Sequence, residues 1–166
     1  MKCLIQLESL CYLKKLLINM SNVDQDNNNL FMGLALELAY TAFDNDEVPV
    51  GAVIVQRRNS EILSAFANQM RSLKSSIAHA EMLAIQKAMK VTHNERLIEC
   101  DTYVSLEPCP MCAQAISFAR IKNLYFAAED EKSGGVLNGP KIFDSTSCHH
   151  KPQVHHGMMG KESSQL

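Results

Sequence analysis

Two short clusters of metal-binding residue types constrain the fold of this chain more than any other feature. The first is His79-Ala80-Glu81, and the second is Pro108-Cys109-Pro110-Met111-Cys112. Zinc takes tetrahedral nitrogen and sulfur ligands, and a catalytic zinc site supplies three of them and leaves the fourth position to water. One histidine and two thiolates therefore predict an open zinc site. The fold must bring both clusters to one point.

Each cluster is expected at the start of a helix. Residues 79–89 carry an apolar stripe at helical spacing, and a second helix is predicted over residues 109–119. Cys109 and Cys112 are three positions apart, so their sulfurs project from one face. Prolines suit the first turn of a helix. A helix N-terminus lowers the pKa of a thiol and favours negative charge that develops nearby, so both features suit a catalytic metal site.

Glu81 is not needed as a metal ligand and follows His79 by two positions. Zinc lowers the pKa of a bound water to about 7, and a carboxylate beside that water can carry protons. A lone C-x-x-C is also typical of a redox pair or of half a structural zinc knuckle, and a lone histidine often only caps a helix. A structural site would need a fourth ligand, and a redox pair would not need His79 and Glu81. The combined pattern therefore predicts a hydrolytic deaminase site.

Size and composition indicate one globular domain. The chain has 166 residues, of which 46% are hydrophobic, enough for a single core. A formal net charge of -2 gives no general attraction to nucleic acid, so a polyanion would have to meet a local basic surface. Scattered basic residues are more typical of a solvated surface. The candidates for such a surface are Arg57, Arg58, Arg71, Lys74, Lys132 and Lys141.

The six cysteines predict thiols rather than disulfides. A disulfide framework requires secretion, but polar residues such as Gln6, Glu8 and Lys14 interrupt the apolar N-terminus, which has no signal-peptide pattern. This segment is also too short to span a bilayer. We therefore expect a reducing, cytoplasmic compartment and no membrane partner.

The chain is expected to divide near residue 30. Residues 24–29 include five asparagines or aspartates, which predict a polar linker from Met20 to Asn29. Before it, residues 2–18 have weak helical periodicity and are expected to form an accessory helix. Alternatively, Met20 is the true initiator. The prediction is an N-terminal extension at residues 1–29 and a zinc-dependent deaminase domain at residues 30–166.

Hydrophobic periodicity predicts alternating helices and strands in that domain. Helices are predicted at residues 30–43, 79–89 and 109–119. Strands are predicted at residues 48–55, 62–67, 102–106 and 124–127, with a hairpin turn at residues 57–60. The order α-β-β-α-β-α-β predicts an α/β fold in which helices cover both faces of a mixed sheet.

Several motifs together resemble one known family. They are Glu-Val-Pro-Val-Gly-Ala-Val at residues 47–53, Ala-His-Ala-Glu at 78–81, Leu-Glu-Pro-Cys-Pro-Met-Cys-Ala at 106–113 and Asp-Glu-Lys-Ser-Gly at 130–134. Over about residues 30–166 the chain closely resembles bacterial tRNA-specific adenosine deaminases. The resemblance implies a three-layer α/β/α cytidine-deaminase-like fold with a mixed central sheet, one zinc ion per subunit and a homodimer.

The resemblance also implies a reaction and the residues that perform it. The wobble adenosine of a tRNA anticodon stem-loop would be flipped out and converted to inosine with release of ammonia. His79, Cys109 and Cys112 would bind zinc, and Glu81 would move the protons. The residues expected to contact substrate are Asn68, Val50, Ala80, Leu106, Asp130 and Lys132.

Three departures from the family pattern accompany the resemblance. Ser75-Ser76-Ile77 replaces the common Asp-Pro-Thr before the histidine, and residues 1–29 have no counterpart. The chain also stops at Leu166, inside what should be the last helix. This truncated helix predicts weaker RNA binding, dimer packing or stability, with intact zinc chemistry.

The late cluster Cys148, His149, His150, His155 and His156 is a second candidate for a metal site. Closely spaced histidines in a stretch with glycine and serine usually lie on the surface, and no strand or helix boundary is predicted to fix their geometry. We therefore expect no second metal site, although His149 or His150 can contact substrate.

Two other functions share the metal-site motifs. One is a deaminase of a free base or nucleoside, of the guanine or cytosine type, and the other is a catalytically silent RNA-binding subunit. Segments 47–53 and 130–134 favour the tRNA enzyme, while the pI of about 6.3 is compatible with a small substrate. Intact Glu81 argues against a silent subunit.

Overall fold

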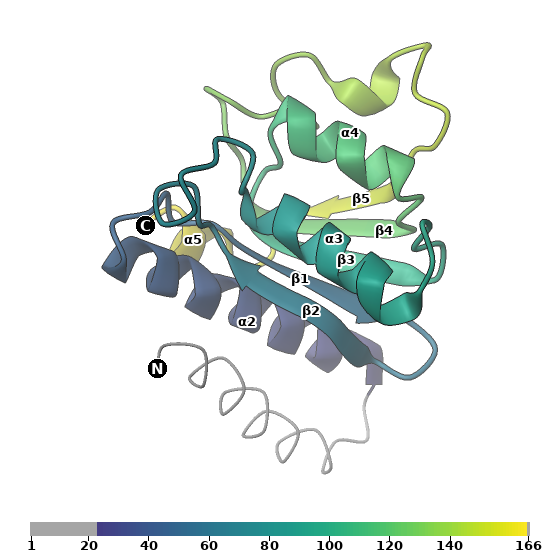
Figure 1. Cartoon of the computed structure of the whole chain (residues 1–166), viewed down its shortest axis with the longest axis horizontal. Helices are drawn as coiled ribbons and strands as arrows, with labels where there is room; N and C mark the ends of the chain where they lie inside the picture. Colours follow the sequence, from purple (N-terminus) through teal and green to yellow (C-terminus); the bar gives the residue numbers. More distant parts are fainter. Residues whose placement is uncertain (1–22, 166) are drawn as a thin grey trace.

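A computed structural model describes residues 23–165 as a sheet with helices on both sides (Figure 1). The elements in chain order are α2 (Val23–Asp44), β1 (Gly51–Gln56), β2 (Glu61–Ala67), α3 (Ala80–Thr92), β3 (Cys100–Leu106), α4 (Pro110–Phe118), β4 (Asn123–Ala128), η2 (Ile142–Asp144), β5 (Gln153–His156) and α5 (Gly160–Ser163). Among these described residues, no helix combines the length and the apolar character needed to cross a bilayer.

The sheet is mixed, as predicted. Its strand order is β2-β1-β3-β4-β5. β1 pairs antiparallel with both β2 and β3, whereas β3, β4 and β5 run parallel to one another. The parallel strands β3 and β4 need a crossover, and α4 supplies it. The helix that begins after Cys109 is therefore held at the C-terminal edge of β3.

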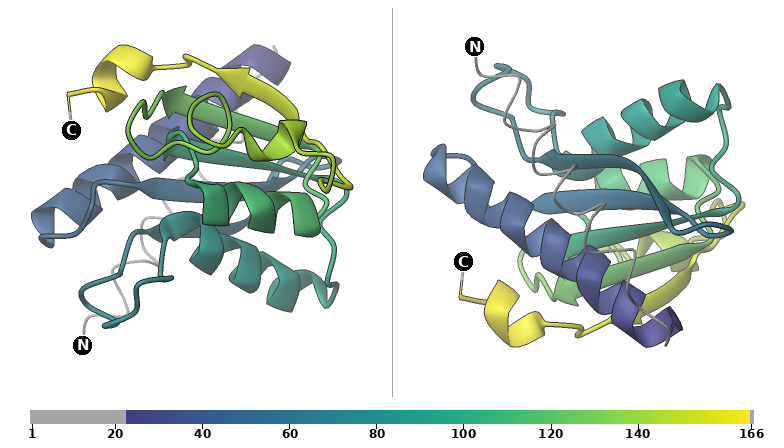
Figure 2. Two further views of the ribbon diagram at one scale, coloured as in Figure 1. Left: turned by 90° about the horizontal axis from the view of Figure 1, so that it is seen from above. Right: turned by 90° about the horizontal axis from the view of Figure 1, so that it is seen from below.

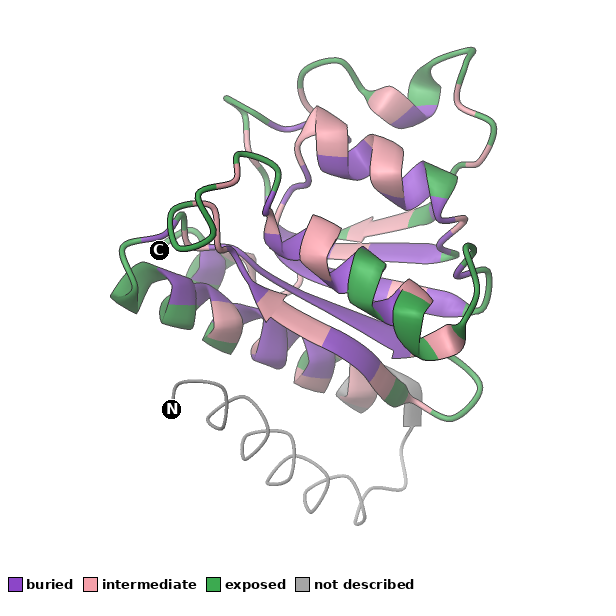
Figure 3. Cartoon of the chain, in the orientation of Figure 1, coloured by how far each residue is buried: buried purple, intermediate pink, exposed green. Residues whose placement is uncertain are grey.

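Helices cover both faces of the sheet, which confirms the three-layer prediction. α3 and α4 lie on one face, and α2 and α5 lie on the other (Figures 1 and 2). On the first face Ala84 and Ile116 are buried against Ile54 and Val104, and on the second Phe31 is buried against strand residues that include Val53. The burial pattern follows these two layers, with the inner sides of the helices buried and their outer sides exposed (Figure 3). Both helices that carry the motifs thus share one face.

α2 lies very close to the start of β1, and Gly51 makes this possible. A Cβ atom at Gly51 would be 2.1 Å from the carbonyl oxygen of Ala35 and 2.6 Å from the Cβ of Leu38. Since no side chain fits in this gap, only glycine allows the helix to pack so near the strand. The strand was predicted to begin at Val48, but β1 begins at Gly51. Pro49 has no N–H to donate to a neighbouring strand, which explains the later start.

The predicted linker up to Asn29 is wrong in the described region, because α2 already begins at Val23 and not at Leu30. The first turn of a helix leaves backbone N–H groups free, so a run of asparagines and aspartates is compatible with a helix start. Asn28 is also held by the sheet, since its Oδ1 accepts a hydrogen bond of 2.5 Å from the hydroxyl of Tyr103. The accessory helix predicted at residues 2–18 and the Met20 start lie outside the described residues.

The late histidines lie partly in a strand, which corrects a second prediction. His155 and His156 belong to β5, whose partner is β4. The ring of His155 stacks on Tyr125 with centroids 4.5 Å apart, and Tyr125 stacks on Tyr103 at 4.6 Å. These three residues occupy paired positions on β3, β4 and β5. Strand pairing and ring stacking therefore fix the geometry of this segment.

Candidate metal centre and active site

His79, Cys109 and Cys112 come together at the N-termini of α3 and α4. Their ligand atoms all lie within 4.8 Å of one another. The Nδ1 of His79 is 3.7 Å from the Sγ of Cys109 and 3.5 Å from the Sγ of Cys112. Zinc bonds of about 2.3 Å to sulfur and 2.0–2.1 Å to nitrogen at a tetrahedral angle separate the ligand atoms by about 3.6 Å. The three residues thus fit a zinc ion.

The two helix starts leave these side chains free to bind a metal. His79 is the N-cap of α3 and Cys109 is the N-cap of α4, and neither side chain makes a capping hydrogen bond. Pro110 occupies the first turn of α4, where the missing N–H removes no intrahelical bond. Both helix dipoles therefore direct positive potential at one point, which stabilises thiolates and developing negative charge.

The protonation of the two thiols differs because they share one hydrogen bond. The hydrogen bond from Cys112, together with that from His79, lowers the pKa of Cys109 to about 4. The pKa of Cys112 is raised, because its thiol donates to Cys109 and is buried. One ligand is therefore already a thiolate at neutral pH. The second must lose its proton as a metal binds.

Glu81 lies next to this cluster with an unsatisfied oxygen. Its side chain is 4% exposed, and its Oε2 has no hydrogen-bond partner within the described part of the chain. Burial raises the pKa of this carboxyl above its ordinary value. A buried polar atom without a partner is costly, and such atoms in native proteins mark functional positions or sites for an absent ligand. Glu81 is therefore available to a group that enters from outside the protein.

A cavity of about 280 Å³ opens beside Glu81. This volume is close to the lower end of the roughly 300–1,000 Å³ range of small-molecule sites. Seven residues singled out from the sequence line it: Val50, Asn68, His79, Glu81, Leu106, Cys109 and Asp130. Ala80 and Cys112 are buried beside the lining, and Lys132 is exposed on the segment that follows Asp130. His149 and His150 do not line the cavity.

One wall of the cavity is held by Glu47. Its carboxylate accepts hydrogen bonds from the Nδ2 of Asn68 at 3.3 Å, from the backbone N–H of Arg71 at 3.0 Å and from that of Ser72 at 2.8 Å. Burial would raise the pKa of Glu47, but the hydrogen bonds from Arg71 and Ser72 outweigh it and lower the pKa. The ionised carboxylate thus fixes the segment that begins at Asn68.

A second part of the cavity wall is held by Glu107. Its carboxylate accepts hydrogen bonds from backbone N–H groups of the segment 130–138, including those of Asp130 at 3.1 Å and Val136 at 3.0 Å. Burial would raise the pKa of Glu107, but the hydrogen bonds from Asn138, Asp130 and Val136 outweigh it and lower the pKa. A buried carboxylate thus holds each of these two segments of the wall.

Comparison with known proteins identifies the family. Residues 25–128 match the cytidine and deoxycytidylate deaminase zinc-binding region. A tRNA-specific adenosine deaminase of Agrobacterium fabrum is 45% identical over 136 residues, which cover 82% of this chain and 88% of that protein. A solved tRNA:A34 deaminase, studied for A-to-I editing at the wobble position of transfer RNA, matches with a TM-score of 0.79 and 45% identity, covering 81% of this chain and 96% of that chain.

This chain belongs to the tRNA-specific adenosine deaminases. It has their cytidine-deaminase-like α/β/α fold, and zinc is the cofactor of this deaminase family. A guanine deaminase of Bacillus subtilis is also similar, with 37% identity, a TM-score of 0.59 and coverage of 64% of this chain and 66% of that chain. The fold is therefore shared by deaminases that bear the names of different substrates.

Four residues that line the cavity of this deaminase were not predicted as site residues. They are Val48, Met70, Glu107 and Ser133. Glu107 has the clearest signal, because an acidic residue directly after a buried strand and two positions before a metal-binding cysteine is an unusual place for a charge. Ser133 lies within the Asp-x-Lys-Ser-Gly motif, where only two positions were selected.

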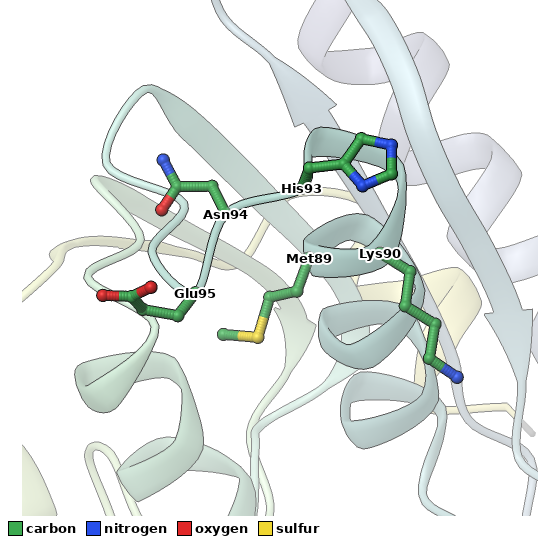
Figure 4. A pocket seen from close by; sticks show the side chains of 5 residues that line it. All are labelled: Met89, Lys90, His93, Asn94 and Glu95. Carbon is green, nitrogen blue, oxygen red and sulfur yellow. The ribbon is translucent and has the colours of Figure 1, made fainter.

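A larger hollow of about 550 Å³ lies at the C-terminal end of α3 in this deaminase. It is lined by Met89, Lys90, His93, Asn94 and Glu95. Figure 4 shows that these side chains spread apart and do not converge on a common point. None of the metal-cluster residues or Glu81 contributes to it. The chemistry therefore belongs to the smaller cavity at the helix N-termini.

Proposed function

We propose that this deaminase hydrolyses the wobble adenosine of a tRNA anticodon to inosine and releases ammonia. The observation that carries the proposal is the position of Glu81, a buried carboxylate with a free oxygen in a base-sized cavity beside the His–Cys–Cys cluster. The identity to named tRNA-specific adenosine deaminases supports adenosine in tRNA as the substrate. The net reaction adds water to adenosine and yields inosine and ammonia.

His79, Cys109 and Cys112 are proposed to hold the zinc ion. When bound, zinc supplies a water molecule that ionises near neutral pH. Glu81 takes a proton from the attacking water and returns it to N1 of the adenine ring. It then transfers the remaining hydroxyl proton to the amino group on C6, which leaves as ammonia. One carboxylate therefore serves as base and as acid, which suits its raised pKa.

The cavity walls are proposed to recognise the flipped base and its neighbours. Val50 and Leu106 present apolar surface to the ring, and buried Ala80 leaves space for it beside the metal centre. Asn68 presents a side-chain amide, which Glu47 holds in place. Asp130 and Lys132 meet flanking nucleotides, where a carboxylate can accept from a ribose hydroxyl and an ammonium can meet phosphate.

Deamination of free guanine is the second candidate, favoured by the similarity to the Bacillus subtilis guanine deaminase. The small cavity admits a free base as well as a flipped nucleotide. A catalytically silent RNA-binding subunit is the third, and the unpartnered Oε2 of Glu81 argues against it. The substrates distinguish these candidates, because only the first requires an anticodon loop.

The deciding experiment measures inosine in an anticodon stem-loop incubated with the zinc-loaded chain. The control stem-loops carry guanosine at the wobble position or adenosine only elsewhere. Free guanine, cytosine and adenosine are assayed in parallel for ammonia release. We expect inosine at the wobble position alone, and none with Glu81→Ala. Ammonia from a free base with no inosine would replace the proposal by the second candidate.

We also propose that the deaminase is a homodimer in the cytoplasm. The family resemblance supports the dimer, as do large apolar side chains at the surface, of which Phe118 is 71% exposed. The four cysteines of the described region form no disulfide, which agrees with a reducing compartment. Sedimentation equilibrium of the full chain tests the dimer, and a monomer at micromolar concentration would refute it.

A further inference from the structure

Glu107 gathers five N–H donors on one buried carboxylate. Its Oε1 accepts from the backbone N–H groups of Val136, Leu137 and Asn138 at 3.0, 2.8 and 2.9 Å. Its Oε2 accepts from the backbone N–H of Asp130 at 3.1 Å and from the Nδ2 of Asn138 at 2.7 Å. The side chain is only 3% exposed. The four backbone donors and the side-chain donor all belong to the segment 130–138, which we call the pocket loop.

The pocket loop is pressed against the start of α4 by two glycines. A Cβ at Gly134 would lie 2.5 Å from the Oε1 of Glu107, and one at Gly135 would lie 2.5 Å from the backbone nitrogen of Pro110. The N–H of Gly135 also donates to the carbonyl of Pro108 at 2.9 Å. The loop therefore packs directly on the turn that carries Cys109. Glu107 is the charged group at the centre of this contact.

The first part of the pocket loop faces the cavity. Asp130 and Ser133 line it, and the Oδ1 of Asp130 accepts from the N–H groups of Lys132 and Ser133 at 3.0 and 2.9 Å. The Asp130 turn therefore has its own internal bonds. Its location relative to the metal centre depends on the bonds that tie the loop to Glu107 and on the Gly135–Pro108 bond, because residues 131–133 are exposed.

We propose that Glu107 is a positioning residue that sets substrate affinity by placing the Asp130 turn at the rim of the cavity. The inference rests on the proposed function, in which Asp130 and Lys132 meet flanking nucleotides. Both carboxylate oxygens of Glu107 accept hydrogen bonds from the pocket loop, and through these bonds it acts on substrate binding. A neutral side chain of the same shape cannot replace it, because a glutamine offers one acceptor oxygen and places an N–H₂ group opposite two donors.

The main test compares Glu107→Gln with Glu131→Gln in the zinc-loaded chain. Glu131 is exposed in the same loop, so it receives the same chemical change without loss of these bonds. For Glu107→Gln we expect kcat/KM on the stem-loop to fall by roughly ten- to a hundredfold through KM, with kcat and zinc content retained. An unchanged KM would overturn the proposal. So would a fall in kcat with loss of zinc, since Glu107 would then act on Cys109.

Coupling to Lys132 separates positioning from general destabilisation. In the wild-type background, Lys132→Ala should raise KM, because it removes the proposed phosphate contact. In the Glu107→Gln background the same substitution should have little further effect, since the lysine is already displaced. If Lys132→Ala raises KM by the same factor in both backgrounds, the proposal is overturned. Glu107→Asp, which keeps the charge, should recover part of the affinity.

Hydrogen exchange tests the loop without any catalysis. The N–H groups of Asp130, Val136, Leu137 and Asn138 report directly on the bonds to Glu107. These N–H groups should exchange faster in Glu107→Gln than in the wild type. In Glu131→Gln their exchange rates should equal those of the wild type. Equal exchange in all three proteins would overturn the inference. If the wild type makes no inosine but the exchange result holds, the proposed substrate fails and the anchoring of the loop stands.

Discussion

The Nδ1 of His79 lies 3.5 Å from the Sγ of Cys112, although 33 residues separate them in the chain. This short distance joins the start of α3 to the first turn of α4. It is within the range of a hydrogen bond to sulfur and is also close to the spacing of two ligands on one zinc ion. The protein therefore builds a metal site from two helix ends that share one face of the sheet.

Replacement of Cys109 by alanine should remove the metal. With two ligands left, the zinc content should fall from about one per chain to a small fraction, and the melting temperature should fall with it, because metal binding contributes to folding. Elemental analysis and thermal unfolding measure both. Cys148→Ala removes a thiol outside the cluster and should keep its zinc. Stoichiometric zinc in Cys109→Ala would exclude Cys109 as a ligand.

The substitution Glu81→Gln should separate metal binding from catalysis. The amide keeps the shape of the side chain but cannot accept and return a proton, so activity should fall by at least about a hundredfold while zinc remains. Single-turnover assays on the stem-loop give the rate, and elemental analysis gives the zinc. The exposed Glu95→Gln is the matched control. Near-normal turnover by Glu81→Gln would refute the proton-transfer role.

The stability contributed by Glu47 should depend on pH in a defined direction. Its pKa in the folded protein is lowered below the ordinary 4.5, so its contribution is complete above that value and is lost as the pH falls through the folded pKa. Glu47→Gln should therefore be less stable than the wild type at pH 7, and the difference should shrink toward pH 3. Urea unfolding at several pH values measures it. A difference in stability that stays constant with pH would contradict this assignment. Glu37→Gln, at an exposed position, serves as the control.

Two glycine substitutions should change stability in opposite directions. Gly51→Ala places a methyl group within 2.1 Å of the Ala35 carbonyl, which should cost about 1–3 kcal/mol as the helix is displaced. Gly33→Ala meets nothing within 4 Å in the middle of α2, so it should stabilise the protein by about 0.4–1 kcal/mol. Chemical denaturation of both variants measures the difference. Equal effects would show that α2 does not pack on β1 as described.

The sequence predicted the members of the candidate metal cluster because local rules place each of them at a helix start. Cys109 and Cys112 are neighbours on one helix face. The apolar stripe of residues 79–89 places His79 at the start of another helix. The polar run before Leu30 was misleading, since composition alone does not show that Tyr103 holds Asn28 from across the sheet. The polarity of this segment indicated a linker. In the folded chain the contact between Asn28 and Tyr103 supports a helix there instead.

The features that the sequence did not predict depend on partners far away in the chain. β5 has only four residues, and His155 is ordered by stacking on Tyr125, which periodicity cannot reveal. The role of Glu107 is similar, because its donors lie 23 to 31 residues downstream. The motif shows that a glutamate lies two positions before Cys109. Only the folded chain shows which loop it holds.

The position of β1 between β2 and β3 has a consequence for the order in which the sheet forms during synthesis. On one side β1 pairs with β2, which follows at once, and on the other Ala52 pairs with Val104 of β3. A chain leaves the ribosome N-terminus first at roughly 5–20 residues per second. The β1–β2 hairpin is therefore available seconds before β3, and until then the edge of β1 that pairs with β3 is unpaired. All three zinc ligands are present only after Cys112 has emerged from the ribosome. The metal centre therefore forms late, after the β1–β2 hairpin and after β3 has been synthesised.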